Sequence, residues 1–406
     1  MTRVRNQFKP SMILLLAVFA GSGASAWAQS TPSPLNSQVA NSGLPPGNEI
    51  AWLTELASAQ VARGDPAAAL ATLADLERTL DATPDRAASV ARYANVPELA
   101  GVFARVGEVH KARLLLIGLP GRSEDIARGA ANICAAGHVG EGLELIPPAT
   151  RARKMGDREQ ASLLGAVAHA RAQCGHRDEA AKLFARALKK ASKLREPPSD
   201  ELGLLSRADQ ARQVIMRRMI DARMFETLPA SADFADPEFQ LDLLLARARA
   251  GARDIAPPAL ELPRASGGYE PPADFNFRIR AARAEIFARL GAGNSADEEF
   301  SIARSLAIAS GNGGTMADQL AQLAEIRLSL GDREAARQLL DEAVPVIPPD
   351  ALSNHLGRWY GPALVSRFVR VYALLGDDAM AHRIMEGRGP GVAVTANEFT
   401  DGVRMR

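Results

Sequence analysis

Small and large apolar residues recur around eight glycines in this chain, and the pattern predicts pairs of packed helices. Five residues after each glycine, seven of the eight positions are alanine, and nine residues after it all eight are apolar. Seven residues before each glycine, the side chain is again alanine, leucine or valine. Glycine readily adopts the left-handed conformation that ends a helix, so each one marks a turn between two helices. These glycines are Gly64, Gly107, Gly137, Gly175, Gly251, Gly291, Gly331 and Gly376.

Each predicted helix pair has a physical reason to stack against another pair. Alanine five residues after the turn lets two helices approach closely, and the larger residue one turn later fills the space beside it. Acidic residues follow some of the turns, as in Gly331-Asp332 and Gly376-Asp377, where they can cap the next helix. One pair cannot bury its own apolar stripe, whereas stacked neighbours can. The chain is therefore predicted to be all-α, with helical hairpins arranged as an α-solenoid.

The recurring positions seven before, five after and nine after each glycine, which we call columns, resemble the tetratricopeptide repeat. The best match is 320–348, followed by 168–191 and 284–308. The resemblance covers about 49–388 and implies about eight to nine tetratricopeptide-like hairpins. Glycine spacing runs from 30 to 76 residues, whereas the family repeats every ~34 residues. The widest gap, Gly175 to Gly251, is predicted to hold a ninth hairpin whose second helix is interrupted by prolines.

The predicted hairpins divide the chain into arrays separated by an irregular, proline-rich middle. Proline removes a backbone donor and stops helices, so 254–274, with five prolines, is expected to form a long loop. The tail offers no amphipathic helix, so either the tail in extended form or a partner is expected to cover the last hairpin. The predicted segments are a signal peptide (1–28), a flexible leader (29–48), an N-terminal array (49–192), irregular hairpins and the loop (193–275), a C-terminal array (276–388) and a tail (389–406).

The N-terminus has the pattern of a cleavable secretory signal. Arg3, Arg5 and Lys9 precede an apolar run over 12–20, and small residues end at Ala28, after which cleavage is expected. That run is too short to span a bilayer as a helix, and no later segment is long and apolar enough. An uncleaved anchor is the alternative. The mature chain is predicted to be periplasmic or secreted, without a membrane span.

Charge and motif content argue against several functional classes. The formal net charge is +1, which gives no broad positive surface for nucleic acid. The chain has no nucleophile elbow, zinc-protease motif or phosphate-binding loop. We therefore expect no enzyme and no cofactor. The retained alternative is an enzyme with its site in the proline-rich middle, near Tyr269 and Asp274.

The sequence leaves two possibilities open for the two cysteines. Cys134 and Cys174 lie near the ends of consecutive first helices, so a disulfide between neighbours and a pair of small buried thiols both fit. His138 and His176 lie close to them in sequence, but the spacings typical of zinc sites are absent. No metal site is predicted.

Resemblance to the tetratricopeptide family implies that first helices form a concave binding face, at ten, six and three residues before each turn. Small residues mixed with isolated charges suit an extended peptide, so the predicted function is an exported scaffold that binds a protein or peptide in the cell envelope. The alternative function is a component of an envelope secretion or polysaccharide-assembly machine. A third possibility is that this face is solvated and binds no ligand. The oligomeric state is left open. Candidate binding residues are Arg105, His169, Arg249, Glu285, Arg289, Glu325 and Arg370.

Overall fold

Sixteen α-helices and two 3-10 helices make up the described part of the chain, which contains no strand. The all-α class predicted from the sequence is therefore confirmed. The described residues belong to one compact unit, Leu44–Arg406. The structure is a computed structural model, and it describes residues 46–82, 95–118, 122–149, 155–194, 207–228, 237–255, 273–347 and 361–385.

Several predicted segments lie outside these residues. They are the signal peptide 1–28, most of the leader 29–48, most of the proline-rich loop and the tail 389–406. Within the described ranges, no helix is long and apolar enough to cross a membrane.

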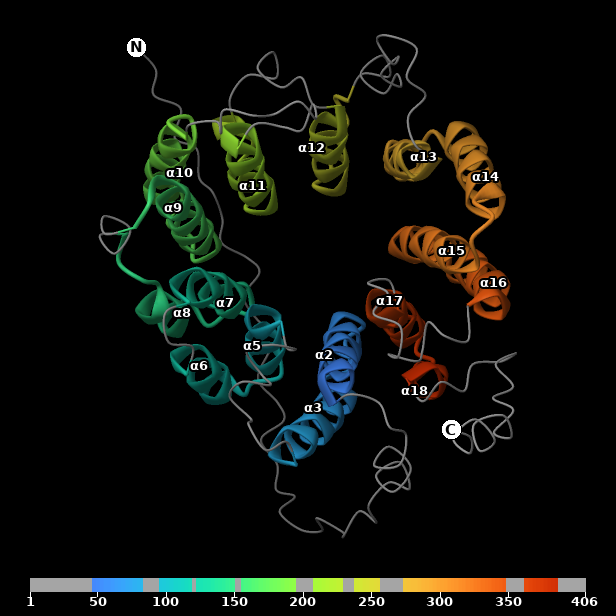
Figure 1. The fold of residues 1–406 in the computed structure, drawn as a ribbon, viewed down its shortest axis with the longest axis horizontal. Helices are drawn as coiled ribbons and strands as arrows, with labels where there is room; N and C mark the ends of the chain where they lie inside the picture. The colour runs from blue at the N-terminus through green and yellow to red at the C-terminus, as the bar shows by residue number, and fades with distance from the viewer. Residues whose placement is uncertain are drawn as a thin grey trace, which may run out of the picture. The chain divides into compact units, whose positions relative to one another are not determined.

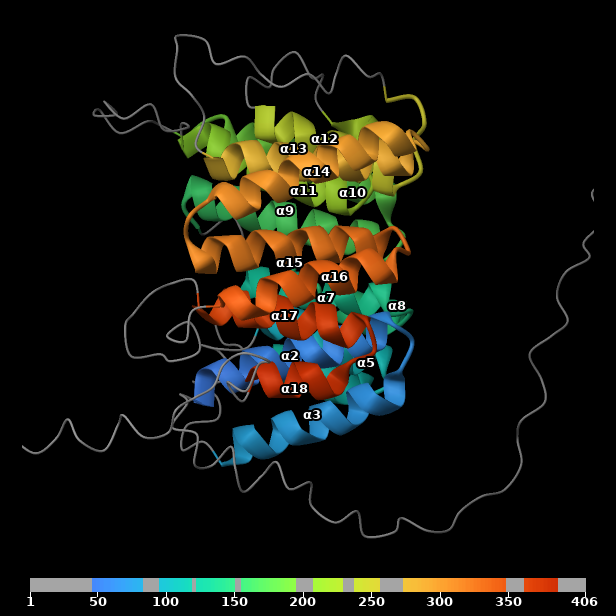
Figure 2. The same cartoon turned by 90° about the vertical axis from the view of Figure 1, so that its right-hand side faces the viewer.

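Nine helices, which we call the first helices, pack against one another in chain order. In Figure 1 they lie on the inner side of the arrangement, and Figure 2 shows that the helices stack side by side. They are α2 (Pro46–Ala62), α5 (Val96–Arg105), α7 (Ser123–Ala135), α9 (Asp157–Gln173), α11 (Arg207–Asp221), α12 (Pro237–Arg249), α13 (Ala273–Arg289), α15 (Gly313–Ser329) and α17 (Gly361–Leu374).

Seven of the first helices are followed by a second helix that packs on the outer side (Figure 1). After α11 the described residues contain only the 3-10 helix η2 (Phe225–Thr227) before α12, and Leu228 has an extended conformation. The prolines predicted to interrupt this second helix begin at Pro229. The second helices are α3 (Pro66–Asp81), α6 (Val109–Ile117), α8 (Val139–Leu145), α10 (Arg177–Ala191), α14 (Gly293–Ala309), α16 (Arg333–Ala343, continued by η5, Val344–Val346) and α18 (Asp378–Met385).

The eight turn glycines all adopt the predicted left-handed conformation, with φ between 79° and 97°. At Gly331 the amide donates to Leu328 O at 3.0 Å, and the amide of Asp332 donates to Arg327 O at 2.9 Å, which ends α15. The Asp332 side chain then accepts from the amide of Ala335 at 3.1 Å and caps α16. Sequence and geometry agree here because only glycine takes this φ without steric cost.

A ninth turn has the same geometry without a glycine. Arg223 has φ 53°, and the amide of Met224 donates to Met219 O at 2.9 Å, as at the glycine turns. This turn ends α11 within the gap between Gly175 and Gly251, where a ninth hairpin was predicted. The glycine pattern could not locate it because a non-glycine residue occupies the strained position.

The predicted columns of small and large residues form the contacts between helices. The described alanines five residues after the turn are at most 3% exposed. Six of the eight residues at seven before the turn are alanines, and each is fully buried. Alanine therefore occurs where helix axes approach, and the large residues nine after the turn fill the adjacent space.

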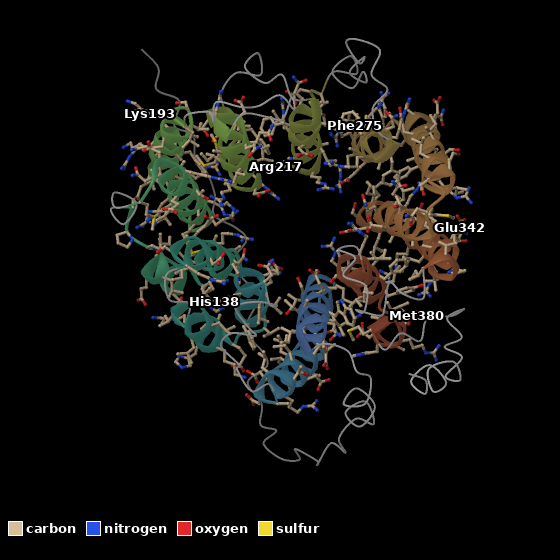
Figure 3. All side chains as sticks on the ribbon, viewed as in Figure 1. His138, Lys193, Arg217, Phe275, Glu342 and Met380 are labelled. Carbon is tan, nitrogen blue, oxygen red and sulfur yellow. A yellow bond between two sulfur atoms is a disulfide. The ribbon has the colours of Figure 1, made fainter. Side chains whose placement is uncertain are left out.

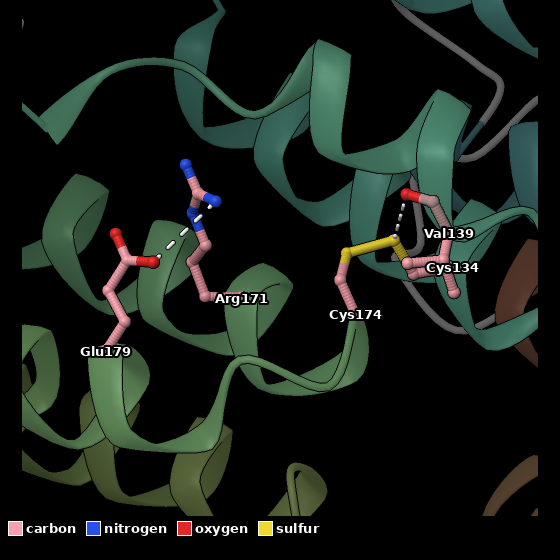
Figure 4. Close-up of a disulfide and its surroundings, with 5 residues drawn as sticks. All are labelled: Cys134, Val139, Arg171, Cys174 and Glu179. Atoms are coloured by element: carbon pink, nitrogen blue, oxygen red, sulfur yellow. Dashed lines mark hydrogen bonds and ion pairs between the residues drawn. A yellow bond between two sulfur atoms is a disulfide. The ribbon is translucent and has the colours of Figure 1, made fainter.

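The two cysteines form a disulfide, which resolves the alternatives left open by the sequence. Cys134 lies in the last turn of α7 and Cys174 follows α9, with their Cα atoms 5.0 Å apart (Figure 4). The Cys134 Sγ atom also lies 3.7 Å from the Val139 carbonyl oxygen. No cluster of potential metal ligands occurs among the described residues. The bridge therefore joins two neighbouring first helices covalently.

Gly142 is the one exception in the alanine column, and the disulfide explains it. A Cβ atom added to Gly142 would lie 2.3 Å from Cys134 Sγ and 2.9 Å from Ala130 O. The sulfur thus occupies the space that a methyl group fills in the other pairs. Cys134 and Gly142 are complementary, so α8 approaches α7 more closely than an alanine would allow.

The last helix pair packs against the first, so the contacts between helices form a closed circuit. Trp52 and Leu56 of α2 share one apolar cluster with Phe368 and Tyr372 of α17. Helix α2 thus packs against α17, the last first helix among the described residues (Figure 1). The expectation that the tail or a partner covers the last hairpin is wrong for the part that α2 occupies.

Polar contacts also stabilise this junction between α2 and the last helix pair, which we call the seam. Arg63, in the turn after α2, donates to the two carboxylate oxygens of Asp378 at 2.6 and 2.8 Å and to Ala373 O at 2.7 Å. Gln60 Nε2 donates to Asp378 at 3.0 Å. Burial alone would raise the pKa of Asp378, but the bonds from Arg63 and Gln60 lower it overall.

Candidate functional site

A cavity of about 480 Å³ lies on the first helices α12, α13, α15 and α17. Its position follows from the repeat, because consecutive first helices present equivalent register positions to the same side. The position six before the turn contributes a lining residue from all four helices. These residues are Leu245, Glu285, Glu325 and Arg370.

Glu285 is the most buried charge in the cavity wall, and two arginines neutralise it. Its side chain is 0% exposed. Arg249 of α12 donates to both carboxylate oxygens at 2.7 Å, and Arg289 Nε donates to one of them at 2.8 Å. Such a buried carboxylate is stable only when paired, so this group fixes the α12–α13 junction.

Glu325 anchors a second group of charges on α15 and α17. Arg370 donates a short hydrogen bond to Glu325, and Arg367 Nε donates to Asp318 at 2.7 Å. Arg370 Nη1 also lies 4.0 Å from Glu55 of α2, across the seam. Burial raises the pKa of Glu55, Arg370 opposes this shift, and the nearby Glu98 and Glu325 reinforce it.

The cavity also has an apolar wall, made mainly by α12 and the first half of α13. Leu241 and Leu245 of α12 are half-buried, and Phe275 of α13 is half-buried as well. Ile279 and Ile326 complete the wall. Figure 3 labels Phe275 and shows polar side-chain tips, blue and red, extending from the first helices toward the centre. The site is therefore amphipathic, because paired charges and partly exposed apolar side chains line the same cavity.

The polar side chains of the first helices form a stripe that continues beyond the cavity. We call the positions 13, 9, 6 and 2 before each turn the inner stripe. These positions lie on one helix face because they are separated by three or four residues. Contacts within the stripe join neighbouring helices: Ser58–Glu98, Ser162–Glu124, Arg217–Asp242, Arg249–Glu285, Arg289–Ser329, Arg370–Glu325 and Arg370–Glu55.

Five of the seven predicted binding residues belong to the cavity or its immediate support. Arg249, Glu285, Glu325 and Arg370 line it, and Arg289 contacts both Glu285 and the lining residue Ser329.

The other two predicted residues lie elsewhere on the inner stripe. Arg105 is on α5, with its guanidinium 4.0 Å from Glu98. His169 is on α9, where burial, reinforced by the positive charges of Arg218 and Arg128, lowers its pKa to about 4. His169 is therefore a neutral side chain at pH 7.

Sequence reasoning missed other cavity residues because they lie outside the predicted positions ten, six and three, although Leu241 and Ala281, ten before a turn, do line the cavity. Asp242, Gln322 and Arg367 all lie nine residues before a turn, and Arg278 lies thirteen before one. The position three before the turn, which was predicted to face the ligand, contributes none of the residues that line this cavity. The recurrence of polar residues at nine before the turn was the signal that could have found them.

Comparison with known proteins does not place the chain in a family. No protein-family model matches it, and no curated protein is similar enough to count as a relative. The resemblance to the tetratricopeptide repeat therefore rests on the columns and turns described above.

Proposed function

We propose that this chain is an exported scaffold that binds a segment of a partner protein on its first helices. In this proposal the helix pairs are tetratricopeptide-like units of an α-solenoid whose two ends meet. The observation that carries the proposal is the cavity, because four consecutive helices contribute equivalent positions to one amphipathic surface. Repeat proteins bind in this way, since side chains at one register position form a continuous surface.

Export is supported by the disulfide together with the signal-like N-terminus. The bridge joins Cys134 and Cys174, and the described residues contain no free cysteine. Disulfides persist in oxidising compartments such as the periplasm and are rare in the cytosol. The proposed location is the periplasm, after removal of 1–28.

The binding proposal also has support in the low cost of ordering the site. Side chains of the cavity are already held by ion pairs with Glu285 and Glu325, so few of them must become ordered when a ligand binds. A preformed surface loses less conformational entropy on binding than a flexible one. An extended segment would place alternate side chains against the apolar and the charged wall.

Site-specific photo-cross-linking tests the proposal. A photoreactive amino acid at Leu245 or Ile326, both in the cavity, is expected to cross-link one partner segment in cells, identified by mass spectrometry. The same amino acid at Ile308, an exposed position on the second helix α14, is the matched control and should not capture it. A synthetic peptide of the captured segment should then bind the purified chain by calorimetry. Equal capture from Ile308, or failure of the peptide to bind, would reject the proposal.

A further inference from the structure

The charges of the cavity differ in how accessible they are to a ligand. Arg249 is 54% exposed and Arg278 is exposed, while Arg370 is 37% exposed. Of the lining carboxylates, Glu285 is 0% exposed and bound by two arginines. The surface offered to a ligand is therefore richer in guanidinium groups than the residue composition of the wall suggests.

The remaining carboxylates are also engaged by neighbouring arginines. Glu325 is 30% exposed and is held by Arg367 and Arg370, and Asp242 is held by Arg217 at 3.2 Å. A guanidinium presents five N–H donors, so an arginine paired with one carboxylate keeps donors for a second. A carboxylate from a ligand can thus join these groups without breaking the pairs, whereas a ligand ammonium group would have to displace an arginine.

The apolar wall adds a second requirement. Leu241, Leu245 and Ile279 line the cavity from α12 and α13, where Arg278 also lies, and Arg367 and Arg370 line it from α17. In an extended peptide, neighbouring side chains point to opposite sides. An apolar residue next to an acidic one would therefore direct one side chain to the leucines and the other to the arginines on the opposite side of the peptide.

We infer that the cavity takes an acidic–apolar segment: an extended peptide with a glutamate or aspartate side chain directed to Arg278, Arg367 and Arg370, and a neighbouring apolar side chain on Leu241 and Leu245. This inference rests on the proposed function and specifies its ligand. The shared chemistry is a carboxylate, which an acidic side chain or the end of a chain could supply. Both sources must therefore be compared.

Labelled peptides and fluorescence anisotropy test the inference on the full mature chain. Three probes, acetylated and amidated at their ends, alternate leucine with glutamate, glutamine or lysine. The glutamate peptide is expected to bind roughly tenfold more tightly than the glutamine peptide, since a hydrogen bond to a charged group is worth about that factor. Its affinity should fall as salt rises. The lysine peptide should bind more weakly than both.

Matched variants connect the effect to the cavity. Arg278→Ser should weaken the glutamate peptide about tenfold and leave the glutamine peptide unchanged. Arg304→Ser is the control, because it removes an arginine from the second helix of the same pair, where Arg304 pairs with Glu342. Leu245→Ser should weaken the glutamate and glutamine peptides together.

Several outcomes would overturn the inference. It fails if the lysine or glutamine peptide binds as tightly as the glutamate peptide, if no probe binds, or if Arg278→Ser has no effect. It also fails if a glutamine peptide with a free carboxyl terminus matches the amidated glutamate peptide, since the ligand would then be a chain end. A cross-linked partner segment without acidic residues would overturn this inference while leaving the proposed function intact.

Discussion

The α7–α9 junction and the α11–α12 junction join equivalent first helices in very different ways. Helices α7 and α9 are linked by the disulfide and by Arg218 of α11, which binds both Glu124 and Ser162. At the α11–α12 junction, the ion pair between Arg217 and Asp242 is 50% and 38% exposed.

The α7–α9 junction is also more tightly packed than the α11–α12 junction. Many α7 and α9 side chains are fully buried, whereas in α12 only Phe239 and Ala248 of the described side chains are. A full second helix follows α9, while between α11 and α12 the described residues form only η2. The cavity thus begins where packing is lightest, because leucines of α12 left half-buried can contact a ligand.

Removing the disulfide should have the largest effect on stability. The bridge closes a segment of 40 residues, for which chain entropy gives a stabilisation of about 4 kcal/mol. The double variant Cys134→Ala, Cys174→Ala should lower the free energy of unfolding by about that amount in urea titrations. A loss below about 1 kcal/mol would show that packing alone holds the α7–α9 junction.

Gly142 provides a sharper test of the same junction. Gly142→Ala should cost about 2 kcal/mol in the wild-type chain, because the new methyl group overlaps Cys134 Sγ. In the Cys134→Ala, Cys174→Ala background the cost should shrink by about 1 kcal/mol or more, since the sulfur is gone and alanine favours a helix. Gly140→Ala is the control, because nothing lies near a Cβ atom there. Additive effects of Gly142→Ala and cysteine removal would contradict the explanation.

The half-buried His169 of α9 should make the α7–α9 region sensitive to acid. The pKa of His169 is lowered from 6.5 to about 4. Unfolding therefore takes up a proton between these values, and stability is lost as the pH falls from 6.5 to about 4. His169→Gln should remove roughly 1 to 3 kcal/mol of that loss, measured by urea unfolding at pH 7 and pH 4.5. An unchanged pH dependence of the free energy of unfolding would mean that folding does not lower the pKa of His169.

The smallest effect is expected at the α11–α12 junction. Arg217→Ala should change the free energy of unfolding by less than about 0.5 kcal/mol, because exposed ion pairs contribute little. Arg218→Ala, one residue along, is the contrast, since its guanidinium is 13% exposed and binds Glu124. It should cost about 2 kcal/mol or more. Equal losses in the two variants would remove the distinction between the junctions.

Much of the fold was predictable because it depends on local chemistry. The glycine turns and the alanine column were read correctly, since a left-handed φ and close helix approach each restrict the residue type strongly. The α11 turn falls outside the glycine pattern because Arg223 takes the position of glycine, and Gly142 is explained only by its contact with Cys134. In both places a particular tertiary environment overrides the repeat.

The candidate site was predictable in part. The position six before the turn faces the cavity in four helices, so Glu285, Glu325 and Arg370 could be named from the repeat. Arg278 and Arg367 could not, because they lie thirteen and nine residues before the turn, outside the positions assumed to face the ligand. The contact between α2 and α17 could not be foreseen either, since the small rotation from each pair to the next is set by packing and has no local sequence signal.

The seam has a consequence for how this molecule is made. Gln60 and Asp378, which bond across it, are 318 residues apart in the chain. A polypeptide that emerges from its N-terminus must keep Trp52 and Leu56 uncovered until nearly the whole chain has been delivered. Long-range pairing of this kind is slow and leaves apolar surface exposed until it forms. We therefore expect the newborn chain to depend on a holding chaperone, and fragments that stop before α17 to aggregate.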